Sequence, residues 1–298
     1  MVTQKYTGLI VAVVTPFDTS GEVNISVLAD HLDWLIKQGV HGVMVTGTAG
    51  EFANLSDDER LLVAGRTVQT VGGRVPVIFH TGHMNRAAAL ALSRRAEDAG
   101  VDAVMLTPPP IIRPTQTEIE RYFREIAAAV SINVVIYNNP SRVAVNISAD
   151  TLIRLSEVDN IVALKDSGRN LNETADVINE AGDRMAILSG ETDLFLPILA
   201  LGGMGGILTM PNFIPKIHLE LFEKFQRGDL EKARILNKKL AKFSKVLSVE
   251  GKYHAAIKAA MRQVGIPIGF PRLPLTDVSV DTQARIREQL KKEGLLPS

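Results

Sequence analysis

Residues 133–167 read NVVIYNNPSRVAVNISADTLIRLSEVDNIVALKDS. They begin with a short apolar run, Asn133–Asn138, and end with another, Ile161–Lys165, and the amphipathic segment Ser148–Ser156 lies between the two runs. Neither run alternates apolar with polar residues, which is typical of strands that are buried on both faces of a parallel sheet. A buried strand, a helix and a second buried strand in this order predict an α/β fold.

The same alternation recurs along residues 1–210. Short Val- and Ile-rich runs, each bounded by Gly, Pro, Asn or Ser, predict eight strands at Leu9–Val14, Gly42–Thr46, Val75–His80, Asp102–Thr107, Asn133–Asn138, Ile161–Lys165, Met185–Ser189 and Gly206–Thr209. Amphipathic segments between them predict helices at Ile25–Gln38, Ser56–Thr70, Asn85–Ala99, Thr115–Ala129, Ser148–Ser156, Asn170–Glu180 and Thr192–Leu199. The alternation favours a (β/α)8 barrel, with a doubly wound open sheet as the competing fold.

Two details of the sequence refine this prediction. Ser56, with Glu59 three residues later, has the spacing of a capping box and predicts a helix start. The final third lacks strands and predicts helices at Pro215–Gln226, Asp229–Ser248, Gly251–Gly265 and Asp281–Gly294. We therefore divide the chain into a barrel that carries the active site, residues 1–210, and a C-terminal helical region packed on it, residues 211–298.

The composition excludes several classes of function. The 298 residues include 33 Lys or Arg and 33 Asp or Glu, so the basic excess of a nucleic-acid or anionic-membrane surface is missing. The absence of cysteine excludes disulfides, a thiol nucleophile and a thiolate metal site. No apolar run reaches the ~20 residues of a membrane span, and we find no secretory signal. We expect a cytoplasmic protein that binds neither nucleic acid nor membrane.

Catalytic side chains of a barrel lie where its strands end. Lys165 follows the buried run Ile161–Leu164, where burial would disfavour its ammonium form, and a neutral amine can attack a ketone to form a Schiff base. A lysine that pairs with a carboxylate at the barrel rim is the alternative. Similarly, Tyr137 is either a proton donor and acceptor or a structural residue, and Arg142 either binds a substrate carboxylate or forms a surface ion pair.

Other motifs give weaker signals. The loop Gly47–Glu51 could bind a carboxylate through its N–H groups and the Thr48 hydroxyl, although most short Gly loops are only turns. His80 and His83 could ligate a metal, but no third ligand is suggested nearby, and we predict no metal site. The remaining histidines are isolated, and we interpret them as structural. Gly202–Gly206 lacks the sequence context of a dinucleotide loop, and we interpret it as a tight approach to the eighth strand.

Four motifs occur in order along the chain: Gly47-Thr48-x-Gly50-Glu51, Tyr137-Asn138-x-Pro140-Ser141-Arg142, Lys165 and Gly202-Gly203-x-Gly205-x-Ile207. In this conjunction the sequence resembles the dihydrodipicolinate synthase and N-acetylneuraminate lyase family of pyruvate-dependent class I aldolases, over nearly its whole length. The resemblance implies a (β/α)8 barrel, a homotetramer, a lyase activity on a small keto acid and an aldehyde, and no metal or organic cofactor.

The resemblance also implies roles for single residues. Lys165 matches the lysine that forms the imine with pyruvate, and Tyr137 matches the tyrosine that moves protons to and from the reacting atoms. Thr48 matches the threonine that holds the pyruvate carboxylate.

Four further positions match groups that bind substrate. Gly47 and the backbone of Ala49 belong to the loop that holds the carboxylate, and Ile207 matches a residue whose backbone faces the keto acid. Arg142 matches an arginine that, in dihydrodipicolinate synthases, meets the carboxylate of the aldehyde substrate.

Two positions depart from the dihydrodipicolinate synthase pattern. Those enzymes carry a second threonine and a tyrosine from a neighbouring subunit, which form a proton relay with the catalytic tyrosine. Here these positions hold Ala49 and, most nearly, Ile111, and neither side chain can relay a proton. The departure favours an aldolase of a 2-keto-3-deoxy acid or a 4-hydroxy-2-keto acid.

Two alternatives stay open. One is a dihydrodipicolinate synthase, which condenses pyruvate with aspartate semialdehyde in lysine biosynthesis; Arg142 suits the distal carboxylate of that substrate as well as that of 4-hydroxy-2-oxoglutarate. The other is a protein that binds a keto acid without turnover.

Overall fold

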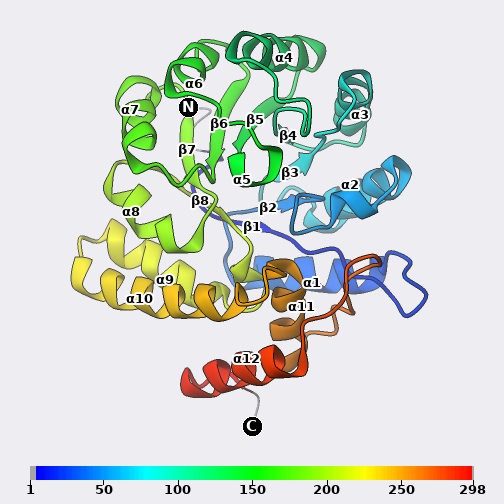
Figure 1. Cartoon of the computed structure of the whole chain (residues 1–298), viewed down its shortest axis with the longest axis vertical. Coiled ribbons are helices and arrows are strands. Elements are labelled where there is room, and N and C mark those ends of the chain that lie inside the picture. The colour runs from blue at the N-terminus through cyan, green and yellow to red at the C-terminus, as the bar shows by residue number, and fades with distance from the viewer. Residues whose placement is uncertain (1–4, 297–298) are drawn as a thin grey trace.

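The computed structural model describes residues 5–296 and contains a closed barrel of eight parallel strands (Figure 1). The strands are β1 (Gly8–Ala12), β2 (Gly42–Val45), β3 (Val77–His80), β4 (Ala103–Leu106), β5 (Asn133–Asn138), β6 (Ile161–Asp166), β7 (Ala186–Ser189) and β8 (Gly205–Leu208). Each pairs with the next along the chain, and β8 pairs with β1 in register Ile207 to Ile10. This closure excludes the open sheet and confirms the predicted barrel.

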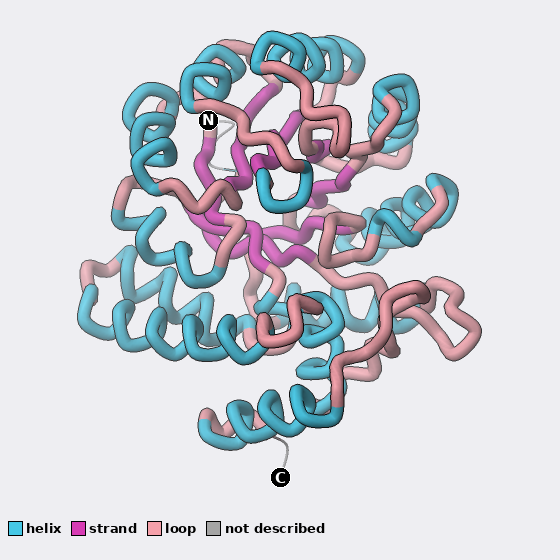
Figure 2. Tube along the Cα trace, in the orientation of Figure 1, coloured by secondary structure: helices cyan, strands magenta, loops and turns pink. Residues whose placement is uncertain are grey.

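The described chain also contains helices, most of which surround the strands on the outside of the barrel (Figure 2). They are α1 (Ile25–Lys37), α2 (Asp57–Val71), α3 (Arg86–Asp98), α4 (Gln116–Ala129), α5 (Pro140–Val143), α6 (Ala149–Leu155), α7 (Leu171–Ala181), α8 (Phe195–Ala200), α9 (Pro215–Gln226), α10 (Leu230–Leu247), α11 (Tyr253–Gln263) and α12 (Val280–Lys292). The helix ends lie within two residues of the predicted ends, except that Thr192–Leu194 is a 3₁₀ turn before α8. The short helix α5 is an addition to the prediction.

Local chemistry explains where the helices begin. The Ser56 hydroxyl accepts a hydrogen bond from the Glu59 N–H at 3.2 Å, and the Glu59 carboxylate accepts one from the Ser56 N–H at 2.8 Å. This confirms the predicted capping box at α2. Thr115 and Glu118 form a second capping box at α4, which satisfies N–H groups that the first helical turn leaves free.

The Gly202–Gly206 segment brings β8 against β1 as predicted. A Cβ atom on Gly205 would lie 2.1 Å from the backbone oxygen of Gly8, and one on Gly203 would lie 2.8 Å from the backbone oxygen of Ile198. Gly205 also has φ of +158°, which side chains rarely allow. Glycine is therefore required for the strand pairing that closes the barrel.

The chain after β8 is helical. α9 contacts β1 and α8, where it completes the ring of helices, and α10 packs against α9. α11 and α12 pack against each other, and α12 lies at the lower edge of the molecule in Figure 1. Among residues 5–296, no helix has both the length and the apolar character needed to cross a bilayer.

Candidate active site

A polar pocket of about 540 Å³ opens where the strands end. Its walls come from the segments that follow β2, β5, β6, β7 and β8, and from α10 and the start of α11. The lining residues include five of the predicted site residues: Thr48, Ala49, Tyr137, Arg142 and Lys165. Residues from separate parts of the sequence thus meet at the edge of the barrel where such enzymes carry their active sites.

Lys165 lines the pocket from the barrel wall itself. It lies on β6 directly opposite Tyr137 on β5, and its side chain is 4% exposed. The amine Nζ lies 4.1 Å from the centre of the Tyr137 ring. No carboxylate of residues 5–296 lies within ion-pair distance of Nζ, so the rim ion pair considered as the alternative is not observed. The amine can therefore react with a molecule in the pocket.

The hydroxyl of Tyr137 has a partner that the sequence did not predict. Asn139 Nδ2 donates a hydrogen bond to Tyr137 Oη at 2.7 Å, and Asn139 Oδ1 accepts one from Ser141 Oγ at 2.8 Å. Both Tyr137 and Asn139 are buried. Because the amide donates, the phenol keeps its own hydrogen for another acceptor, and the pocket is where that acceptor can bind.

A buried network holds the ends of β5 and β6 together. Asn138 Nδ2 donates to Asp166 Oδ1 at 3.3 Å and to Asn146 Oδ1 at 2.9 Å, and Thr174 Oγ1 donates to Asp166 Oδ2 at 2.7 Å. Asn138 and Asp166 are the neighbours of Tyr137 and Lys165 in the chain. The network therefore fixes the backbone that carries the phenol and the amine.

The loop after β2 contributes Thr48 and Ala49 to the pocket, whereas Gly47 does not line it. A buried ion pair anchors this loop: Glu51 Oε1 lies 2.6 Å from Lys258 Nζ on α11, and the two side chains are 1% and 0% exposed. Lys258 also donates to the Phe270 carbonyl at 3.1 Å. Glu51, a member of the quoted motif, thus ties the loop to the C-terminal helices.

Neither Ala49 nor Ile111, at the two positions where dihydrodipicolinate synthases carry the proton relay, brings a hydroxyl to Tyr137. Ala49 is buried in the pocket wall, and Ile111 is 75% exposed on the loop after β4 and does not line the pocket. The group that contacts the phenol oxygen within the described chain is the Asn139 amide.

Two nitrogen-bearing side chains of the pocket lack hydrogen-bond and ion-pair partners among residues 5–296. Arg142, on α5, is exposed and forms no ion pair with residues 5–296. His254, on α11, has both ring nitrogens buried and without hydrogen-bond partners. Burial, together with the nearby cationic side chains of Arg142, Lys165 and Lys258, lowers the pKa of His254 to about 3. The imidazole is therefore neutral and offers one donor and one acceptor to a ligand.

The opposite side of the mouth is held by an ion-pair cluster. Arg169 contacts Glu191 at 2.9 Å and Asp193 at 2.5 Å, and all three residues line the pocket. Tyr253 lines it as well, and burial raises the pKa of its phenol, which therefore stays protonated. The outer part of the pocket is consequently rich in groups that can bind hydroxyls.

The remaining predicted residues lie elsewhere. Ile207 is fully buried on β8 and does not line the pocket. His80 is buried against the Phe52 ring with centroids 4.5 Å apart, and His83 Nδ1 accepts the Asn85 N–H at 3.1 Å. Within residues 5–296, no three His, Asp or Glu side chains are grouped as a metal would require.

Comparisons with known proteins identify the family. A family model described as "Dihydrodipicolinate synthetase family" matches residues 5–293. The 4-hydroxy-tetrahydrodipicolinate synthase of Syntrophobacter fumaroxidans is 38% identical over 98% of this chain and 100% of its own length. The solved dihydrodipicolinate synthase of Aquifex aeolicus has a TM-score of 0.94 and 34% identity, with 98% of this chain and 100% of that chain covered. The Escherichia coli K12 prophage protein YagE, solved in complex with pyruvate, has a TM-score of 0.94 and 27% identity, with 97% and 99% covered.

Proposed function

The chain belongs to the dihydrodipicolinate synthetase family of pyruvate-dependent class I aldolases, which are lyases, and we propose that it cleaves or forms a 2-keto-3-deoxy acid or 4-hydroxy-2-keto acid through a Schiff base on Lys165. The observation that carries this choice of substrate is the environment of Tyr137. An amide contacts its hydroxyl at 2.7 Å, and Ala49 stands where a dihydrodipicolinate synthase has a relay hydroxyl.

Lys165 begins the reaction. Its amine adds to the C2 carbonyl of the keto acid, and loss of water gives an imine. When the bond between C3 and C4 breaks, its electron pair moves into the imine to give an enamine, the C4 hydroxyl loses its proton, and an aldehyde leaves. Protonation of C3 and hydrolysis of the imine then release pyruvate and restore the amine.

Tyr137 carries the protons in this proposal. A molecule bonded to Nζ lies beside the phenol because the amine is 4.1 Å from the centre of its ring. The phenol can therefore exchange a proton with the C4 oxygen without entry of bulk water.

The loop after β2 binds the acid end of the substrate. We assign the pyruvate carboxylate to the Thr48 hydroxyl and to the backbone of Ala49, which line the pocket and belong to the loop that the ion pair of Glu51 holds in place. Gly47 and Ile207 do not line the pocket, and this assignment gives them no contact with the substrate.

The mouth of the pocket binds the other end of the substrate. Arg142 offers a cation without a protein partner, and His254 offers a neutral donor and acceptor. Together they suit a carboxylate or a hydroxyl on the aldehyde half, and the polar groups of Glu191 and Tyr253 add further contacts for hydroxyls.

One specific observation favours a second candidate. The relatives from Syntrophobacter fumaroxidans and Halalkalibacterium halodurans, at 38% and 34% identity, are both named as 4-hydroxy-tetrahydrodipicolinate synthases. A condensation of pyruvate with aspartate semialdehyde would use Lys165, Tyr137 and Arg142 in the same positions. The non-catalytic alternative would leave the unpaired amine beside the phenol without a role.

The proposal extends to the assembly. We propose a cytoplasmic homotetramer, and the exposed apolar side chains of Ile111 and Ile112 suit a contact between subunits. We also propose that residues 211–298 are a helical extension of the barrel that serves the active site, because Tyr253 and His254 line the pocket.

Reductive trapping tests the Schiff base. Incubation with pyruvate and borohydride should add a pyruvyl mass to Lys165 and leave Lys245, which also lines the pocket, as an internal control. Labelling of Lys165→Ala, or its full activity, would disprove the assignment. Assays with hydroxy-keto acids and with aspartate semialdehyde then identify the substrate; a large preference in kcat/KM for aspartate semialdehyde would establish the second candidate.

A further inference from the structure

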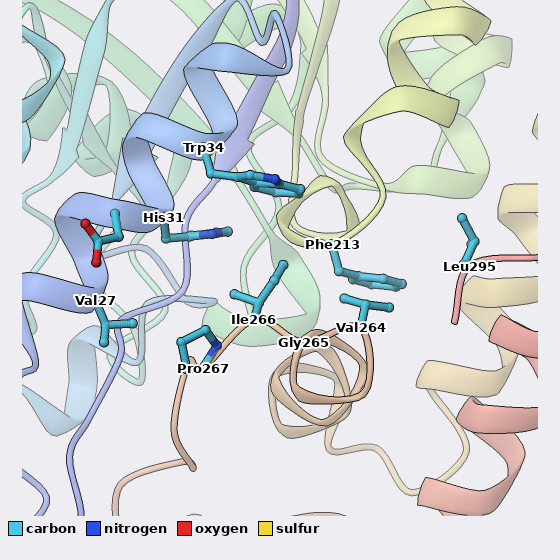
Figure 3. Close-up of a pocket in the computed structure, with 10 residues that line it drawn as sticks. Val27, His31, Trp34, Phe213, Val264, Gly265, Ile266, Pro267 and Leu295 are labelled. Carbon is cyan, nitrogen blue, oxygen red and sulfur yellow. The ribbon is translucent and has the colours of Figure 1, made fainter. Parts of the chain in front are cut away.

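A second cavity, of about 460 Å³, lies outside the barrel between α1, the segment after β8 and the turn after α11 (Figure 3). This volume is within the range of small-molecule sites. The cavity shares no lining residue with the catalytic pocket. It is therefore a separate site, which the proposed reaction does not use.

Most of its wall is apolar. In Figure 3 the side chains of Trp34, Phe213 and Ile266 surround one open space, with His31 on the side of α1. The Trp34 ring stacks on the His31 ring with centroids 5.6 Å apart. Such a wall suits an apolar or aromatic body.

His31, which lines the cavity, has an unused hydrogen-bond acceptor. Asn212 donates its two amide hydrogens to the carbonyls of Ala12 at 2.8 Å and Thr209 at 2.6 Å, so its Oδ1 faces His31 Nε2 at 3.0 Å as an acceptor. Nε2 must therefore carry the hydrogen of the neutral ring, and Nδ1 keeps a free lone pair. Nδ1 is buried and has no hydrogen-bond partner in the described part of the chain, which is unfavourable until a ligand donates to it.

Asp30 adds a charge at the same cavity. Asp30 lines the cavity, is exposed, and forms no ion pair with residues 5–296. Burial lowers the pKa of the neighbouring His31 to about 4, so the imidazole is neutral at physiological pH and does not repel a cation. A ligand that is both a cation and a hydrogen-bond donor satisfies both groups.

We propose that this cavity binds a small organic ammonium ion with an apolar or aromatic body. The body packs between Trp34, Phe213 and Ile266, an ammonium hydrogen is donated to His31 Nδ1, and the charge faces Asp30.

Trp34 makes the proposal measurable, because it is the single tryptophan of the chain. Titration of the full-length protein with 2-phenylethylamine should change the Trp34 emission in a saturable way, with affinity in the millimolar range typical of small fragments, below about 10 mM. Two molecules with the same body are the comparison: 2-phenylethanol should bind more weakly, and 3-phenylpropionate should bind weakest. Calorimetry on the same mixtures measures affinity without relying on the tryptophan.

Variants of α1 locate the binding. Asp30→Asn should weaken the amine about 3- to 5-fold, the size of one exposed ion pair, and leave 2-phenylethanol unchanged. Asp33→Asn is the matched control, because Asp33 lies on the same helix, pairs with Arg74 and does not line the cavity. Val27→Phe should fill the cavity and abolish binding. Absence of saturable amine binding, equal affinity for the carboxylate, or undiminished binding to Val27→Phe would each overturn the proposal.

Discussion

Tyr137 and Lys165 lie at matched positions of neighbouring strands. Their side chains therefore pack against each other, and a substitution of Tyr137 must keep the ring if its effect on the reaction is to be measured alone. The register joins the two residues, and the amine lies over the ring face. A change that removes only the phenol oxygen therefore leaves the packing around Lys165 in place.

Tyr137→Phe tests the proton step. We expect kcat to fall about 10²-fold or more, the usual scale for loss of acid–base catalysis, and the dissociation constant for pyruvate to change little. Steady-state kinetics and borohydride trapping measure the two effects separately. An unchanged kcat would assign the proton transfer to water or to the Thr48 hydroxyl.

Asn139 is predicted to position that phenol. Its amide donates to Tyr137 Oη at 2.7 Å, so it fixes the direction of the phenol hydrogen. We expect Asn139→Val to lower kcat about tenfold, because the phenol loses its orientation, while Lys165 still reacts with pyruvate.

Two controls separate positioning from folding at Asn139. Ser141→Ala removes the hydroxyl that donates to Asn139 Oδ1 at 2.8 Å but leaves the bond to the phenol, and it should change kcat much less. The second control is Asn139→Val in a Tyr137→Phe background: if it lowers kcat there as much as in the unchanged protein, the amide does not act through the phenol.

At the scale of elements, the ion pair of Glu51 and Lys258 joins the loop after β2 to α11. Both side chains are inaccessible to solvent, and burial lowers the pKa of Lys258 although Glu51 opposes that shift. Removal of one partner would leave the other as a buried charge. The pair therefore couples the carboxylate-binding loop to the helix that carries His254.

Lys258→Met should destabilise the protein by about 3–5 kcal/mol, because Glu51 would lose its partner. The double variant Glu51→Gln, Lys258→Met should recover most of this loss, since glutamine is neutral and still accepts the Arg272 N–H that Glu51 now accepts at 3.0 Å. Denaturant unfolding measures each variant. Lys292→Met, in the exposed pair with Glu288, is the control and should change stability by less than about 1 kcal/mol. Equal losses in the single and double variants would contradict the argument.

The elements that could be predicted from the sequence are strands with a continuous apolar run and helices with a repeating apolar face or a capping residue. The runs at Asn133–Asn138 and Pro215–Gln226 agree with β5 and α9 to the residue, because burial of a strand and one face of a helix leave clear patterns. α5 has four residues, too few for any period. Asn139 and His254 could not be identified in advance, because only the folded chain brings Asn139 to the phenol and His254 to the pocket.

At the scale of the whole molecule, contacts between residues far apart in the sequence could not be predicted either. Glu51 and Lys258 are 207 residues apart in sequence, and nothing local to either residue indicates the other. The expected positions of the strand ends allowed us to predict which residues meet at the edge of the barrel. Lys165, Tyr137 and Thr48 do line one pocket. The path of α10 and α11 over the mouth of that pocket depends on packing of the complete chain.

Buried histidines make the stability of the whole molecule depend on pH. Burial lowers the pKa of His31 and His218 to about 4 and that of His254 to about 3, and it lowers the pKa of His80 as well. The ordinary value of 6.5 applies to the unfolded chain. Between pH 6.5 and about pH 4 the unfolded chain therefore binds protons that the folded protein excludes, so stability falls as the pH falls through this window.

His218 allows this dependence to be measured at a single group. It is fully buried on α9, with Nδ1 3.0 Å from the Ile214 carbonyl and Nε2 without a partner. Between pH 6.5 and pH 5, one such histidine should account for about 2 kcal/mol of lost stability. His218→Gln, which cannot take up a proton, should lose that much less over this interval in denaturant unfolding. From pH 7.5 to 8.5 the imidazole is neutral in both states, so the two proteins should show the same slope there; identical slopes below pH 6.5 as well would show that His218 is protonated in the folded protein.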